Sequence, residues 1–157
     1  MAADMFLKID GIAGESEDQK HGKEIEVVSW GWSMSNSGVM PAGGGTSKVS
    51  VQDLSITKNV DASSHALIQA CCSGKHFKDA TLVVRKTGVH HEYLKIEMTD
   101  MRVSQVQSGG DGRGGLLTET ISLNFSKFKF TYYPQKKDGS ADAGKEMNWT
   151  INPTSKA

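Results

Sequence analysis

The sequence predicts a mainly β fold: a two-sheet antiparallel β-barrel with one flanking α-helix at about residues 62–73. Three observations support this prediction. Apolar and polar residues alternate along most of the chain, as half-buried strands require. Glycines number 17 and prolines only 3, a balance typical of tight turns between strands. Several alternating segments also change parity part-way, as β-bulges do, and strands bent in this way can serve both sheets of one small barrel.

The N-terminal part of the chain is predicted to form strands at residues 5–9, 25–34 and 49–56. The first alternates regularly and ends at Gly11. The other two change parity part-way, the third near Asp53, so each is expected to contain a bulge. All three would therefore contribute one apolar face to a common core.

The segment at residues 62–73 is the one convincing helix. Asp61 or Ser63 can cap its first turn, and Gly74 stands where a left-handed C-terminal residue belongs. About 12 residues are marginal for an isolated helix, so this one is expected to pack on a sheet. Its apolar stripe consists of Ala66, Leu67, Ala70 and Cys71.

The C-terminal half returns to alternation. Strands are predicted at residues 80–86, 93–98, 101–106, 117–132 and 148–151. Within the longest of these, Leu123 and Phe125 belong to the predicted core, and the apolar parity slips before Phe128. A strand of this length exceeds the usual ~5–6 residues and is expected to bend around a corner of the barrel.

The segment before residue 36 has two contrasting faces. Trp30 and Trp32 share one parity and are predicted to lie in the core. The opposite face carries only small residues, which suits an assembly surface or the wall of a wide aqueous passage. These residues are Ser29, Gly31, Ser33 and Ser35.

Size and charge exclude several classes of protein. The 157 residues fit one domain over 1–157, and no internal repeat or linker divides them. Eighteen basic residues balance eighteen acidic ones, so no general electrostatic attraction to nucleic acid is expected. There is no secretory signal and no apolar run of about 20 residues, so no membrane insertion is expected.

No motif predicts catalysis, a metal or a cofactor. Gly110, Gly112 and Gly115 match the dinucleotide fingerprint, but an alternating strand follows them where that fingerprint requires a helix. His90 and His91 are adjacent, and neighbouring strand residues point to opposite faces. Cys71 lies near the end of the predicted helix, where a thiol is not activated. The chain is therefore not expected to be an enzyme.

Several segments, occurring in the same order along nearly the whole chain, resemble sequences of the haemolysin co-regulated protein (Hcp) family. They are Met5–Gly11, Gly14–Ser16 with His21, Glu24–Trp32, Val51–Lys58, the Asp61 helix, Ala70–His76, Leu117–Glu119 and Tyr133–Gln135. This resemblance is far more specific than any single motif.

The resemblance implies the tube protein of a type VI secretion system. Family members form hexameric rings with an open lumen, and the rings stack into a tube. A contracting sheath expels the tube with a spike protein of the VgrG type, and small effectors can travel in the lumen. The protein would reside in the bacterial cytoplasm before the sheath contracts and would be exported without a signal peptide. Family sequences often carry Ser between the two tryptophans, where this chain has Gly31.

Two sites follow from this resemblance together with the residue pattern. The small-residue face of Ser29, Gly31, Ser33 and Ser35 is expected to line the lumen and contact effectors. A glycine-rich loop with a short apolar tip is expected to contact the adjacent ring. The loop consists of Asn36, Ser37, Gly38, Val39, Met40, Pro41, Ala42, Gly43, Gly44, Gly45, Thr46 and Ser47.

The alternative is a monomeric ligand-binding β-barrel module for a sugar or a peptide. In that case Trp30 and Trp32 would form an exposed binding platform. The two hypotheses differ in where the tryptophans lie and in the molecular mass in solution.

Overall fold

The computed structural model describes residues 2–38, 48–115 and 117–151. Within these, ten strands and one helix follow in chain order. They are β1 (Ala3–Ile9), β2 (Ile25–Glu26), β3 (Ser29–Gly31), β4 (Met34–Asn36), β5 (Val49–Val51), β6 (Leu54–Asn59), α1 (Ser64–Ser73), β7 (His76–Lys86), β8 (Glu92–Gly109), β9 (Thr118–Tyr132) and β10 (Lys145–Thr150).

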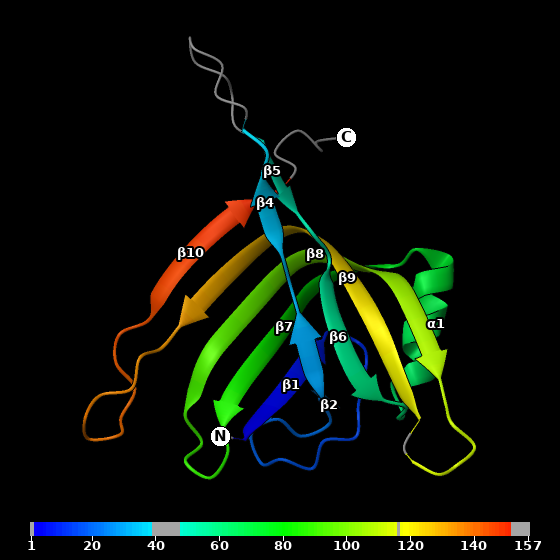
Figure 1. Ribbon diagram of the computed structural model, residues 1–157, viewed down its shortest axis with the longest axis horizontal. Helices are drawn as coiled ribbons and strands as arrows, with labels where there is room; N and C mark the ends of the chain where they lie inside the picture. The colour runs from blue at the N-terminus through cyan, green and yellow to red at the C-terminus, as the bar shows by residue number, and fades with distance from the viewer. Residues whose placement is uncertain (1, 39–47, 116, 152–157) are drawn as a thin grey trace.

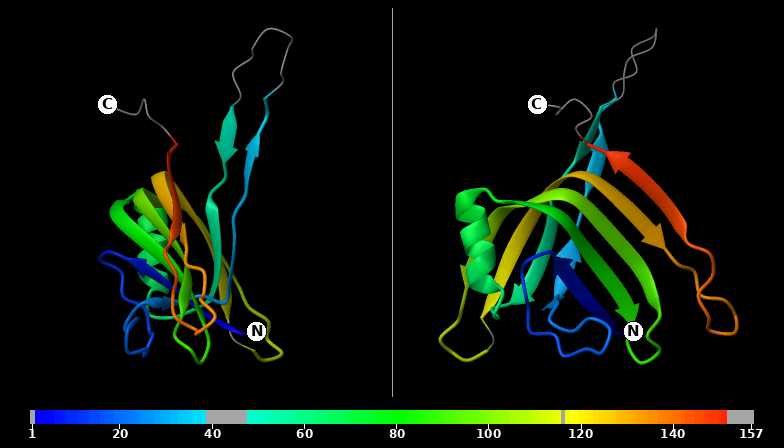
Figure 2. Two further views of the ribbon diagram at one scale, coloured as in Figure 1. Left: turned by 90° about the vertical axis from the view of Figure 1, so that its left-hand side faces the viewer. Right: turned by 180° about the vertical axis from the view of Figure 1, so that it is seen from behind.

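Eight of the strands form one curled antiparallel sheet. Its order is β2-β1-β7-β8-β9-β6-β3, and β10 also pairs with β9. The sheet curves into a half-barrel with α1 on one side and β10 on the other (Figure 1). Strands β4 and β5 form a separate two-stranded hairpin, which projects beyond the sheet (Figure 2). The predicted mainly β, antiparallel fold with one flanking helix is confirmed.

Strands β8 and β9 pair from Leu94–Tyr132 to Gly109–Thr118. The prediction of separate strands at 93–98 and 101–106 was wrong, because β8 runs through both. Asp100 adopts a left-handed backbone (φ 53°), which changes the side-chain parity without reversing the chain. A further register shift lies between Val103 and Gln105. These irregularities let one long strand bend.

The single strand predicted at 25–34 is three short strands. β2 pairs with β1, β3 with β6, and β4 with β5. Each change of partner interrupts the ladder, so the parity change seen in the sequence marks a strand switch. The predicted strand at 49–56 is divided in the same way, into β5 and β6.

The core lies on the concave side of the curled sheet. Leu123 and Phe125 are buried in it, whereas Trp30 and Trp32 are half-buried and pack against it. The ring of Trp32 meets Phe125 and Phe128 edge to face, with centroids 6.0 and 4.8 Å apart. Phe125 and Phe128 are both buried, which confirms the predicted slip of apolar parity between them.

Helix α1 begins at Ser64, two residues later than predicted, and ends at Ser73 as predicted; Gly74 follows it in the left-handed conformation (φ 67°). Leu67 and Ala70 on its inner face are buried, so the helix packs on the sheet as its length requires. Asp61 accepts a hydrogen bond from the backbone N–H of Ser63 (2.9 Å). Asp61 therefore orders the turn that leads into the helix.

A buried ion pair holds the start of α1 against the sheet. Lys58 of β6 is fully buried and contacts the carboxylate of Glu119 on β9. Its ammonium also lies 2.9 Å from Asp61 Oδ1, and the Ser64 hydroxyl donates to Glu119 (2.6 Å). Burial would raise the pKa of Asp61, but hydrogen bonds from Ser63 and Lys58 bring it below its ordinary value. The cluster joins two strands and the helix through charge-assisted hydrogen bonds.

We expect Lys58→Met to lower the free energy of unfolding by ~3–5 kcal/mol, because Glu119 is left buried and uncompensated. The double variant Lys58→Met/Glu119→Leu removes both charges, so its free energy of unfolding should fall by less than that of Lys58→Met alone. Lys8→Met, at an exposed position, should stay within ~0.5 kcal/mol. Urea denaturation measures all three. A Lys58→Met protein as stable as the Lys8→Met control would contradict this role.

Candidate functional site

The outward side of the sheet carries an uncharged polar surface, here called the neutral face. Cross-strand register aligns it in two rows over β3, β6, β9 and β8. One row is Ser29, Thr57, Thr120 and Gln107, and the other is Gly31, Ser55, Ser122 and Gln105. All eight residues are exposed or half-buried. Four strands thus present a continuous wall of small or neutral side chains to solvent.

The structure separates the four predicted lumen residues. Ser29 and Gly31 lie on the neutral face, where β3 pairs with β6. Ser33 lies between β3 and β4, and Ser35 lies on the projecting hairpin. All four are exposed. The neutral face also recruits residues of β6, β8 and β9 that the sequence did not connect, because strand register is a property of the folded sheet.

Another region of the same outward side carries charged residues among neutral ones. Along one row, Lys8 of β1 is followed by Thr81, Glu97, Lys129 and Asn148 on successive strands. The next row contains Asp79, Thr99 and Lys127. A cavity of about 550 Å³ lies along these rows. The two regions meet along β8 and β9, so one sheet presents two chemically distinct surfaces.

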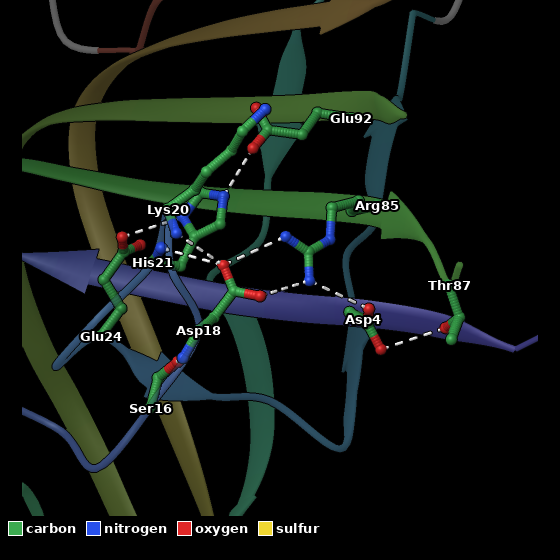
Figure 3. Close-up of polar contacts among 9 residues, drawn as sticks. All are labelled: Asp4, Ser16, Asp18, Lys20, His21, Glu24, Arg85, Thr87 and Glu92. Carbon is green, nitrogen blue, oxygen red and sulfur yellow. Dashed lines mark hydrogen bonds and ion pairs between the residues drawn. The ribbon is translucent and has the colours of Figure 1, made fainter. Parts of the chain in front are cut away.

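A cluster of polar contacts attaches the segment at residues 14–24 to β1 and β7 (Figure 3). Arg85, almost fully buried, donates to both carboxylate oxygens of Asp18 (3.1 and 2.7 Å) and to Asp4 (3.1 Å). Thr87 donates to the other Asp4 oxygen (3.0 Å). The planar guanidinium matches the carboxylate in a bidentate contact, which fixes the direction of the loop.

The same segment is held by aromatic and histidine contacts. His21 stacks on Phe6 with centroids 4.5 Å apart, and the Arg85 guanidinium lies over that ring at 5.0 Å. The His21 imidazole contacts Glu24 (2.9 Å) through one nitrogen and Glu92 through the other. The sequence contained no signal for this cluster, because its members are distant in the chain and follow no motif.

Electrostatics around Asp18 favour its ionised form. The hydrogen bonds from Arg85 hold the pKa of the Asp18 carboxyl well below its usual range, although partial burial opposes this. Backbone N–H groups of Lys20 and His21 lower the pKa further. The geometry binds the segment at residues 14–24 to the sheet.

The structure also places the residues of the sequence motifs. Gly110, Gly112 and Gly115 lie in the turn before β9, so a strand follows them as predicted. His90 and His91 lie between β7 and β8, so the alternation of strand side chains does not apply to them. His91 is buried and bonds the Tyr133 carbonyl oxygen (3.0 Å).

Among residues 2–38, 48–115 and 117–151, no group of three His, Cys, Asp or Glu side chains is placed to hold a metal ion. Within the same ranges, no helix is both long and apolar enough to cross a membrane.

Known proteins are similar to this chain in sequence and in fold. Residues 6–132 match the family described as "Type VI secretion system effector, Hcp". The chain is 46% identical over 156 residues to protein hcp1 of Pseudomonas aeruginosa, covering 96% of each. The Hcp1 crystal structure from Salmonella typhimurium superposes with a TM-score of 0.80 at 42% identity, covering 97% of each chain. A type VI secretion system effector from Yersinia pestis gives 0.79 at 32% identity, covering 94% of this chain and all of the other.

The fold and its surfaces define a β-rich protein whose distinctive features are extended faces and edges. The comparisons specify which one: the chain belongs to the Hcp family of type VI secretion proteins. The resemblance inferred from the ordered sequence segments is thereby confirmed.

We expect Asp18→Asn to reduce the free energy of unfolding at pH 7. The free energy of unfolding of this variant should also fall less steeply than that of the wild type as the pH is lowered. The folded-state pKa of Asp18 is depressed, so its stabilising contribution is present above the unfolded value of ~4 and disappears as the pH falls through the folded value. Thermal unfolding at pH 7 and near pH 2 measures this. Glu17→Gln, exposed in the same segment, is the matched control. An Asp18→Asn deficit of equal size at both pH values would contradict the assignment.

Proposed function

We propose that this protein is the tube subunit of a type VI secretion system. Six copies form a ring around an open lumen, and rings stack into a tube. Membership in the Hcp family supports this proposal, and the neutral face is the observation that carries it. The tube would assemble in the cytoplasm, engage a contractile sheath and a VgrG-type spike, and leave the cell on contraction with small effectors inside.

The neutral face is the surface best suited to line the lumen. Uncharged Ser, Thr and Gln side chains remain wetted yet offer no ion pairs that would hold a cargo in place. The charged rows of the same sheet would attract oppositely charged segments more strongly and are better placed outside the passage. Ser29 and Gly31 therefore remain proposed lumen residues, and the face extends to Ser55 and Ser122 of the neighbouring strands.

The β4–β5 hairpin is the element best suited to join rings. It projects beyond the sheet (Figure 2), and Met34 and Val49 on its stem are exposed apolar residues. Of the proposed stacking loop, Asn36, Ser37 and Gly38 are described and exposed, whereas residues 39–47 lie outside the described residues. An apolar arm directed past the body of the subunit favours contact with the next ring.

The alternative of a binding platform is disfavoured by the tryptophans. Trp30 and Trp32 are half-buried and packed against the core. The Trp32 indole N–H donates to the Gln52 carbonyl oxygen (2.9 Å), and its ring is engaged by Phe125 and Phe128. A ligand would find little free ring surface there.

Native mass spectrometry of the wild-type chain should detect a six-membered species.

Met34→Glu should keep that species but abolish stacked tubes in electron micrographs, because a charge enters the apolar stem of the hairpin. Thr99→Glu, exposed on the charged half of the sheet, should retain both rings and stacks. A wild-type chain that remains monomeric at high concentration would contradict the tube function. Tubes formed by Met34→Glu would contradict the hairpin's role alone.

Gly31→Arg tests the lumen. A Cβ built at Gly31 meets no atom within 4 Å, so the fold and the rings should persist while six guanidinium groups narrow and charge the passage. Effector proteins in the culture medium, measured by mass spectrometry, should decrease by about tenfold or more, while tube protein is still secreted. Thr99→Arg is the matched control outside the neutral face. Unchanged effector export would remove Gly31 from the lumen.

A further inference from the structure

The β4–β5 hairpin is joined to the main sheet by two short breaks. Residues 32–33 separate β3 from β4, and residues 52–53 separate β5 from β6. The hairpin is a two-stranded sheet of its own, so no continuous ladder fixes the angle at which it leaves the curled sheet (Figure 2). A two-stranded hairpin is also marginally stable by itself. Its direction therefore depends on the contacts that the residues of the two breaks make.

Trp32 holds the first break against the core. Its ring lies edge to face on the buried Phe125 and Phe128. Its indole N–H donates to the Gln52 carbonyl oxygen (2.9 Å), and the Gln52 backbone N–H donates to the Ser33 carbonyl oxygen (3.0 Å). Both backbone polar groups of Gln52 are thus bonded to the first break, so the two breaks are held together.

Asp53 ties the second break to the β8–β9 ladder. Its Oδ1 accepts a hydrogen bond from the Asn124 side-chain amide of β9 (2.8 Å), and its Oδ2 accepts one from the Ser104 hydroxyl of β8 (2.6 Å). Ser104 is the residue left without a ladder partner where the β8 register shifts between Val103 and Gln105. Bulges commonly re-aim a side chain, and this one presents the Ser104 hydroxyl to Asp53.

We propose that Trp32 and Asp53 are positioning residues that set the angle of the β4–β5 hairpin within each subunit. The consequence for assembly rests on the proposed tube function: the hairpin meets the next ring already aimed. An arm held in its binding direction loses less conformational freedom on contact, so stacking is favoured. Loss of either anchor should let the hairpin swing about the two breaks.

Asn124→Asp tests the Asp53 anchor. It sets a second carboxylate against Asp53, and because ionised carboxylates only accept hydrogen bonds, the two should repel each other and release the second break. Adding Asp53→Asn restores a donor, since the new amide can donate to the carboxylate at position 124 while its oxygen still accepts from Ser104. Recovery in this double variant would measure the pairwise contact itself rather than a general loss of stability. Ser126→Asp is the matched control, because it adds the same charge two residues further along β9.

Pulsed electron paramagnetic resonance measures the angle of the hairpin. Nitroxides are attached at Ser35→Cys on the hairpin and Thr118→Cys on β9, both at exposed positions. The native Cys71 and Cys72 are replaced by alanine, and an excess of unlabelled chain keeps one labelled subunit in each ring. The distribution of distances between the two labels then reports how far the hairpin swings.

That distribution should be narrow in the chain without further changes and in Ser126→Asp. It should broaden or shift with Asn124→Asp and narrow again in the double variant. Trp32→Phe, which keeps an aromatic ring but removes the indole N–H, should broaden it as well. Circular dichroism checks that each variant is folded. If Asn124→Asp does not fold, Ser104→Ala, which removes the other donor to Asp53, replaces it with the same expectation.

Electron micrographs connect the angle to stacking. Asn124→Asp should lose tubes while native mass spectrometry shows unchanged rings, and the double variant should regain tubes. A narrow, unshifted distribution in a folded Asn124→Asp or Ser104→Ala chain would overturn the role of Asp53 while leaving the tube function standing. A broadened distribution with normal tubes would overturn the link between hairpin angle and stacking. A wild type that forms neither rings nor tubes would instead refute the tube function.

Discussion

The ladder between β8 and β9 is the constraint on which the rest of the molecule depends. It runs from Leu94–Tyr132 to Gly109–Thr118, and β6, β7, β10 and α1 are each attached to one of its two strands. β7 pairs with β8, while β6 and β10 pair with opposite ends of β9. Because β8 bends at the irregularities near Asp100 and Ser104, the sheet curls around its own core. A straight ladder would leave that core open to water.

The bend also divides the outward side of the sheet into two regions. The same two strands carry charged residues at one end, such as Glu97 and Lys129, and neutral ones at the other, such as Gln107 and Thr120. Opposite-charge neighbours across strands are stabilising but attract other charged groups. The neutral end lacks this attraction, so one curled sheet presents a charged surface and an uncharged one side by side.

Two buried cations hold the peripheral elements in place. Lys58 joins α1 to the sheet through Glu119, and Arg85 joins the segment at 14–24 through Asp18. The desolvation cost of such groups offsets much of their attraction, so their net contribution to stability is modest compared with the cost of removing one partner. Their directional hydrogen bonds instead specify where the helix and the loop lie. Apolar contacts alone would allow both to slide.

The sequence by itself determined the mainly β class, the end of the helix before Gly74 and the burial of Leu123 and Phe125, because alternation and capping are local properties of the chain. Its ordered segments also determined the Hcp family. Only the tertiary structure decided that residues 25–34 serve three strand pairs, that Ser29 and Gly31 share a face with β6, β8 and β9, and that Arg85 meets Asp18. These depend on register and on contacts between distant residues, and a one-residue slip would turn every side chain to the other face.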